Sequence, residues 1–177
     1  DFEVDFWNYI SKYISSNTKY FSLLRPFYEI KIAEIFSKKA KKYFNNFSSC
    51  NTNFKILKKF EKNSYWCETC PKCAFVFIIL SAFLDENHLL QIFSKNLYND
   101  EKMFDLFKEL AWISWIKPFE CVWTNSEVVY SLLSASKRYN ENELPKFLDY
   151  FVKNYSQTID ENSLKNELFN YDYNDSI

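Results

Sequence analysis

The sequence of 177 residues contains no glycine. Glycine takes a positive φ at no steric cost, so every turn and helix end in this chain must form without it. We expect asparagine, which also tolerates the left-handed region, to fill some of these positions. The absence also excludes a glycine-rich phosphate-binding loop from these residues. If the protein's chemistry uses ATP, its phosphate loop must lie outside them.

A strong net charge and a long hydrophobic run are also absent. The formal net charge is −1, so no global field favours nucleic acid or an acidic membrane as a partner. The N-terminal residues are charged and aromatic and do not look like a signal peptide. The longest apolar run, residues 74–84, is about half as long as a membrane span. We therefore expect a cytoplasmic protein that does not enter a membrane and does not bind nucleic acid.

Cysteine is scarce, but four of the five cysteines lie between residues 50 and 73. Cys67 and Cys70 form a CxxC pair, Cys73 follows three residues later, and Cys50 precedes them in a polar stretch. Because tetrahedral zinc takes four such ligands, the pattern predicts one zinc ion bound by these four cysteines. A site closed by four thiolates has no open position for water, so the expected role of the zinc is structural.

Alternatives to this zinc site remain open. The cysteines could be buried free thiols, because cysteine is among the most buried residue types, or they could form disulfides. Cys121 or the single histidine, His88, could supply the fourth ligand in place of Cys50. Clustered cysteines without a secretory signal favour a metal in a reducing compartment.

Composition and periodicity predict a mainly α fold. The hydrophobic content of 47% and aromatic content of 21% are enough for the core of one domain. We expect a helical domain with a four-cysteine zinc knuckle, and at most a short β-hairpin that includes a strand over 54–57. Helical spacing and capping residues predict helices over 6–14, 26–39, 71–84, 85–92, 99–113, 124–137, 144–155 and 164–169.

Charged residues gather in the segment 117–127, between two predicted helices. Lys117, Glu120, Cys121 and Glu127 all lie there, and tryptophans flank them. Loop residues of this kind often face a ligand, and proton abstraction beside a carbonyl would use a carboxylate or thiol near a lysine. The simpler interpretation places the charges on the surface and makes Cys121 a small buried filler.

A basic cluster of Lys38, Lys39, Lys41 and Lys42 follows the helix predicted over 26–39. The simpler explanation is a solvated helix C-terminus, where the helix dipole favours cations. The alternative is a nucleic-acid patch, which would make the chain a non-catalytic, zinc-stabilised binding module. Steep salt dependence of RNA binding would then be expected.

Four segments occur in an order and spacing that match a known family. They are YFSLLRPFYEIKIA (20–33), SSCNTNF (48–54), WCETCPKCAFVFIILSAFL (66–84) and KPFECVWTNSE (117–127). Together they resemble the C-terminal half of the MurL family, the UDP-N-acetyl-α-D-muramoyl-L-alanyl-L-glutamate epimerases. The resemblance covers about residues 2–133. It implies a MurL-like zinc-containing helical domain over 1–140, followed by a helical extension over 141–177.

The resemblance implies an isomerase of peptidoglycan synthesis that uses ATP and magnesium. Such an enzyme converts the terminal L-Glu of UDP-MurNAc-L-Ala-L-Glu to D-Glu, and an upstream domain binds the ATP, so this chain would supply only the C-terminal part. The resemblance further implies Glu120 and Cys121 as catalytic residues, and Arg25, Lys117 and Glu127 as substrate-binding residues. A different adenine-nucleotide α-hydrolase with clustered zinc cysteines is the alternative enzyme.

Overall fold

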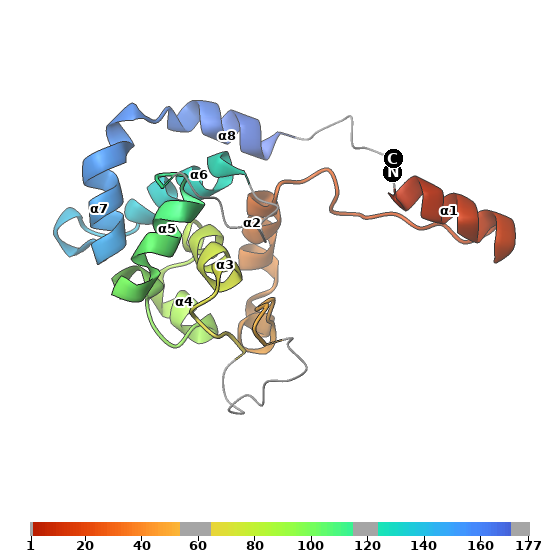
Figure 1. The fold of residues 1–177 in the computed structure, drawn as a ribbon, viewed down its shortest axis with the longest axis horizontal. Helices are drawn as coiled ribbons and strands as arrows, with labels where there is room; N and C mark the ends of the chain where they lie inside the picture. Colours follow the sequence, from red (N-terminus) through yellow and green to blue (C-terminus); the bar gives the residue numbers. More distant parts are fainter. Residues whose placement is uncertain (1, 54–64, 115–123, 171–177) are drawn as a thin grey trace.

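The computed structural model describes residues 2–53, 65–114 and 124–170 (Figure 1). Within these ranges every regular element is a helix, which confirms the mainly α prediction. The strand predicted over 54–57 falls outside them. None of the helices in the described ranges has both the length and the apolar character needed to cross a bilayer.

Eight α-helices and five short 3-10 helices make up the described part of the chain. The α-helices are α1 (Phe2–Tyr13), α2 (Glu29–Lys39), α3 (Pro71–Ser81), α4 (Glu86–Ile92), α5 (Phe104–Leu110), α6 (Asn125–Ser136), α7 (Lys146–Tyr155) and α8 (Glu161–Phe169). The 3-10 helices are η1 (Lys41–Asn46), η2 (Leu97–Asn99), η3 (Glu101–Met103), η4 (Glu141–Glu143) and η5 (Ser156–Thr158).

Helix α3 is the centre of the fold. Every residue from Cys73 to Ser81 is buried, because the helix is apolar on all sides and offers no face to solvent. Helices α2, α4, α5 and α6 all contact it. The one hydroxyl in this run is paired, since Ser81 Oγ lies 2.7 Å from the buried Tyr98 hydroxyl and donates to the Ile78 carbonyl oxygen at 2.7 Å. The polar atoms of this part of the core are therefore satisfied.

Helix α7 belongs to the same core as α3. Its residues Phe147, Leu148 and Phe151 are almost fully buried. The ring centroid of Phe147 lies 4.9 Å from that of Phe107 on α5, within the range of a favourable aromatic pair. The residues that we expected to form an extension after residue 140 thus share their hydrophobic core with the residues before it.

Helix α2 begins three residues later than the sequence predicted. We expected Pro26 in its first turn, but Tyr28 is extended, with φ −63° and ψ 154°, and the helix begins at Glu29. The preceding residues form turns instead, in which Phe27 N donates to the Leu24 carbonyl oxygen at 3.0 Å. The N–H of Ile30, in the first helical turn, is bound by a carboxylate from another helix, which the local sequence could not reveal.

Within the described ranges the left-handed positions are not taken by asparagine. The positive φ angles there are at Glu68 (φ 56°) and Trp112 (φ 55°), whereas Asn96, Asn140 and Asn170 cap helices. Trp112 follows the end of α5, which explains why this helix ends at Leu110 and does not reach residue 113. Glycine would take these two positions at no cost. The left-handed backbone costs other residues about 1–2 kcal/mol each, so contacts of the Glu68 and Trp112 side chains must offset that cost.

Helix α1 stands apart from the other helices (Figure 1). It contacts the segment that leads to α2, where the rings of Phe6 and Tyr20 lie 4.9 Å apart and Arg25 Nη1 lies 3.3 Å from Glu3 Oε2. Several of its large apolar side chains remain in solvent; Phe2 is 68% exposed and Tyr13 is 64% exposed. This arm, residues 2–25, presents an apolar surface of the kind that marks interaction sites.

The place of α7 in the main core can be tested by removing one ring. Phe147→Ala should lower the free energy of unfolding by about 3–5 kcal/mol, because it leaves a cavity in the core. Urea denaturation followed by circular dichroism measures this change. The matched control, Phe2→Ala, removes an exposed ring and should change the free energy by less than about 0.5 kcal/mol. An unchanged main transition in Phe147→Ala would show that residues 141–170 form a separate unit.

Candidate functional site

The four predicted cysteines come together in space. The Sγ atoms of Cys50, Cys67, Cys70 and Cys73 all lie within 4.8 Å of one another. Cys70 and Cys73 are 3.5 Å apart, Cys67 and Cys73 3.7 Å, and Cys50 and Cys70 3.9 Å. Thiolates about 2.3 Å from a tetrahedral metal are about 3.8 Å from each other, whereas disulfide sulfurs are about 2.05 Å apart. The geometry fits a metal and contradicts the disulfide alternative.

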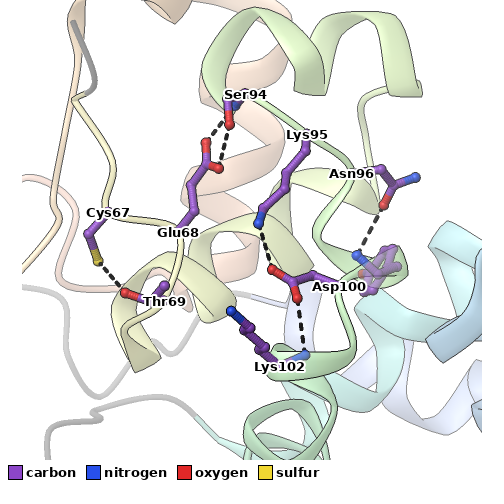
Figure 2. Close-up of polar contacts among 9 residues, drawn as sticks. Cys67, Glu68, Thr69, Ser94, Lys95, Asn96, Asp100 and Lys102 are labelled. Carbon is purple, nitrogen blue, oxygen red and sulfur yellow. Dashed lines mark hydrogen bonds and ion pairs between the residues drawn. The ribbon is translucent and has the colours of Figure 1, made fainter.

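The turn between Cys67 and Cys70 is held by a residue that is not a ligand. Glu68, in the left-handed conformation, is 7% exposed. Its carboxylate accepts hydrogen bonds from the backbone N–H of Ser94 and from Ser94 Oγ, the latter at 2.6 Å (Figure 2). These bonds to the segment after α4 offset the backbone cost at Glu68. We did not predict this role, and the spacing of the cysteines contains no signal for it.

The segment after α4, which donates hydrogen bonds to Glu68, is itself held by polar contacts (Figure 2). Lys95 Nζ lies 2.6 Å from Asp100 Oδ2, and Asp100 Oδ1 accepts from the backbone N–H of Lys102 at 3.0 Å. Asn96 Oδ1 accepts from the N–H of Tyr98 at 3.1 Å. The cysteine turn therefore rests on a segment that the core also holds through the buried Tyr98.

The cysteine cluster lies at the N-terminus of α3. Cys70 is the N-cap, its sulfur accepts from Cys73 N at 3.5 Å, and Pro71 takes the first helical position. Thr69 Oγ1 donates to Cys67 Sγ at 3.4 Å, and Cys67 N donates to Cys50 Sγ at 3.4 Å. Backbone donors and the positive end of the helix dipole stabilise thiolate charge at this position.

The thiols of Cys70 and Cys73 titrate very differently because they share a contact. The hydrogen bond between them lowers the pKa of Cys70 to about 4 and, together with burial, raises the pKa of Cys73. Burial likewise raises the pKa of Cys50. A divalent cation bound among these sulfurs would offset part of the repulsion between neighbouring thiolates.

The alternative fourth ligands are not in the cluster as described. His88 Nδ1 lies 2.8 Å from Asp85 Oδ1, within the first turn of α4, and its ring meets that of Phe44 edge-on. His88 is not among the residues whose ligand atoms converge with the cysteines, which contradicts the alternative in which it replaces Cys50. Cys121 lies outside the described residues. Cys50 takes the fourth position and is fully buried.

Glu127, predicted to bind substrate, joins two helices. Its Oε2 accepts from Thr124 N at 2.8 Å and from Thr124 Oγ1 at 3.1 Å, which completes a capping box at the start of α6. Its Oε1 accepts from Ile30 N, in the first turn of α2, at 3.1 Å. The side chain is 2% exposed. One buried carboxylate therefore satisfies backbone donors of two helices, and its contact with substrate stays a prediction.

The other predicted site residues divide into two groups. Arg25 is described and forms an ion pair with Glu3. Lys117, Glu120 and Cys121 lie outside the described residues, so their roles also stay predictions. The described residues thus bring together the four predicted metal ligands, and they place Arg25 and Glu127 beside other partners.

Comparison with known proteins decides the family. Residues 46–166 match a family described as the MurL C-terminal domain. The chain belongs to this family. The match continues past residue 133, where the resemblance that we identified in the sequence ends, and includes α7 and the first part of α8. No solved structure matches the chain.

Two relatives extend the comparison, and both are named UDP-N-acetyl-alpha-D-muramoyl-L-alanyl-L-glutamate epimerase. The protein of Xanthomonas oryzae pv. oryzae (strain MAFF 311018) is 33% identical over 94% of this chain and 36% of its own length. The protein of Micromonospora sp. (strain ATCC 39149 / NRRL 15099 / SCC 1413) is 38% identical over 64% of this chain and 24% of its own length. The MurL C-terminal chain described here spans about a third or less of each relative.

The joining role of Glu127 predicts a large loss of stability when its carboxylate is removed. Glu127→Ala should lower the free energy of unfolding by about 3 kcal/mol, because buried N–H groups of Ile30 and Thr124 lose their acceptor. Glu127→Gln keeps one acceptor and should cost less. Asp105→Ala, which removes a carboxylate that is 91% exposed, is the control and should cost less than about 1 kcal/mol. Equal urea midpoints for Glu127→Ala and the control would contradict this role.

Proposed function

We propose that this chain is the C-terminal part of an epimerase that converts the terminal L-Glu of UDP-MurNAc-L-Ala-L-Glu to D-Glu. The observation that carries the proposal is the 33% identity to the Xanthomonas oryzae epimerase over 94% of this chain. The name of that relative supplies the substrate, a precursor of peptidoglycan. Because the chain covers only 36% of that relative, the complete activity requires further residues.

The reaction needs a group that makes the α-proton of glutamate more acidic. While the glutamate carboxylate is ionised, its charge opposes formation of a carbanion beside it. Adenylation of the α-carboxylate by ATP, with magnesium, would remove that charge and release pyrophosphate. A base then takes the α-proton from one face, and an acid returns a proton to the other face. Hydrolysis of the acyl-adenylate after this inversion would release AMP and the free carboxylate of the D-Glu residue. We assign the two proton transfers to Glu120 and Cys121, and the binding of a substrate carboxylate or phosphate to Lys117 or Arg25. Glu127 remains a proposed substrate-binding residue.

The ATP site in this proposal belongs to an upstream domain. Without glycine, these residues cannot form a glycine-rich phosphate loop. The exposed apolar side chains of the N-terminal arm, which include Phe2, Tyr13 and Leu23, offer a surface on which such a domain could pack. A cytoplasmic location agrees with the proposal, because free clustered thiolates require a reducing compartment.

We further propose that Cys50, Cys67, Cys70 and Cys73 bind one structural zinc ion. Four sulfur ligands at these separations suit tetrahedral zinc, and they leave no position for a catalytic water. Two of the ligands, Cys50 and Cys73, are fully buried in the main core. Binding free energy at such a site is folding free energy, so the zinc would hold the N-terminus of α3 against residues 48–53.

The zinc proposal predicts a difference between two cysteine variants. Cys73→Ala should lose the metal and part of the helical circular dichroism signal, because α3 loses its anchor at the N-terminus. Cys121→Ala should retain one zinc ion per chain, as measured by elemental analysis of the purified protein. Zinc that is retained in Cys73→Ala and lost in Cys121→Ala would show that the ligand set is wrong.

The epimerase proposal is tested with UDP-MurNAc-L-Ala-L-Glu, ATP and magnesium, followed by hydrolysis and scoring for D-Glu. We expect no product from this chain alone, and D-Glu when the region that precedes it in its gene is included. In that complete form, Glu120→Gln and Cys121→Ala should each lower turnover by about 100-fold or more, as expected for loss of an acid or base. Lys102→Ala, an exposed lysine, should keep full turnover.

Two results would contradict the proposal at different levels. Full turnover in Glu120→Gln, Cys121→Ala and Lys117→Ala would overturn the residue assignments and leave the reaction standing. Absence of D-Glu from a folded, zinc-loaded complete protein would overturn the reaction itself.

A further inference from the structure

A second site lies apart from the cysteine cluster, in a cleft of about 410 Å³ that shares no residue with the cluster. Three segments form it: the end of α2 with the start of η1, the connection between α3 and α4, and the residues that follow α6. Two of its lining residues are apolar, and the other six are polar or charged: Ser37, Lys38, Lys41, Asp85, His88 and Arg138. We call it the basic cleft.

Two cations of the basic cleft, Lys41 and Arg138, make no ion pair among the described residues, whereas Lys38 Nζ lies 2.6 Å from Glu34 Oε1. The charge of Arg138 does help to lower the pKa of Asp85, after the larger effect of the hydrogen bond from the His88 backbone. Arg138 Nε donates to the carbonyl oxygen of Ala82 at 3.0 Å, which fixes the orientation of the guanidinium. Its remaining N–H groups are available to an acceptor. The cleft therefore holds positive charge that a ligand could neutralise.

The carboxylate in the cleft lining is already used within its own helix. Asp85 is the N-cap of α4, and its Oδ1 accepts from the backbone N–H of His88 at 2.9 Å and lies 2.8 Å from His88 Nδ1. These bonds hold Asp85 and His88 together. Because Lys38 is paired with Glu34, Lys41 and Arg138 are the cations that oppose Asp85, the one carboxylate of the lining, and the lining keeps a net positive charge at neutral pH.

A buried hydroxyl in the same cleft lacks a hydrogen-bond partner. Ser37 is 3% exposed, and its Oγ has no acceptor or donor within the described residues. A serine inside a helix commonly bonds the carbonyl one turn before it, and an unsatisfied buried hydroxyl costs free energy. An acceptor oxygen bound in the cleft would remove this cost. This observation is independent of the charge count and also points to an anionic ligand.

We propose that the basic cleft binds a phosphate or diphosphate group. Lys41 and Arg138 neutralise its charge, and Ser37 Oγ donates a hydrogen bond to one of its oxygens. A phosphate suits this set because it carries up to two negative charges and several acceptor oxygens, and because a guanidinium can bind two of them at once. The source of the group rests on the proposed function: the diphosphate of a UDP-linked substrate, or the phosphates of an ATP molecule that the upstream domain mainly holds.

The four lysines that we noted in the sequence at 38, 39, 41 and 42 are arranged in a way that favours a local anion site over a nucleic-acid surface. Lys38 and Lys41 line the cleft, but Lys39 and Lys42 do not. The ammonium of Lys42 instead lies 4.9 Å from the ring centroid of Tyr43. Only alternate members of the cluster thus face one ligand, whereas a strand of RNA would be expected to use a continuous row of cations.

The test measures binding of pyrophosphate, UDP and ATP to the 177-residue chain by isothermal titration calorimetry. Lys41→Ala and Arg138→Ala should each weaken pyrophosphate binding about tenfold or more, and Ser37→Ala about threefold or more, because each removes a donor to a charged ligand. Lys39→Ala is the matched control, since it removes a neighbouring exposed lysine outside the cleft. It should change the affinity less than about twofold.

Two outcomes support the proposal and identify the source of the phosphate. Tighter binding of UDP than ATP, lost in Lys41→Ala and Arg138→Ala, assigns the cleft to the substrate diphosphate. The reverse order assigns it to ATP. Urea midpoints equal to that of the parent protein confirm that the variants remain folded.

Other outcomes overturn the proposal. The first is that none of the three probes binds. The second is that all four variants bind pyrophosphate with equal affinity. The third is that a 20-nucleotide RNA binds and pyrophosphate does not. Because none of these measurements requires turnover, failure of the cleft proposal is distinguishable from failure of the epimerase proposal. D-Glu formation with an unchanged KM for the UDP-linked substrate in Arg138→Ala would reject only the substrate assignment of the cleft.

Discussion

The structure depends on the complete burial of α3. A helix that is apolar on every side can be stable in water only if other elements cover all of it. Helices α2, α4, α5 and α6 supply that cover, and α7 adds Phe147 and Phe151 to the same core. The four cysteines lie at the N-terminus of α3, beside this core. The metal that we propose there would couple metal binding to core packing at this helix end.

Because the chain has no glycine, residues with side chains must adopt the left-handed backbone conformations that glycine would otherwise take. Glu68 adopts a left-handed conformation inside the cysteine turn, and its carboxylate is bonded to Ser94. The strain and its compensation thus lie in one residue. A glycine at this position would relieve the strain but would also remove the bond that ties the turn to the rest of the core. The lack of glycine in the chain is in this way connected to the bond that holds its cysteine turn.

Two buried glutamates show how polar residues organise a mainly apolar core. Glu68 joins the cysteine turn to the segment after α4, and Glu127 joins α6 to α2. Each carboxylate accepts at least two hydrogen bonds from groups that would otherwise be unsatisfied, which is the condition under which a buried charge is tolerated. Both residues belong to segments that resemble the MurL family, so such segments can carry folding roles beside any catalytic ones.

The sequence by itself determined the class of fold, the approximate extents of α4, α6 and α7, and the four cysteines that converge. These features follow from helical periodicity, capping residues and short spacings, which are interactions between near neighbours along the chain. Only the tertiary structure decided where α2 begins, since its Ile30 N–H is bound by Glu127, 97 residues away. It also decided that Glu68 anchors the cysteine turn, and that Ser37, Lys41 and Arg138 line one cleft. Each of these depends on side chains from distant segments that meet only when α3 is buried, and no local pattern encodes such a meeting.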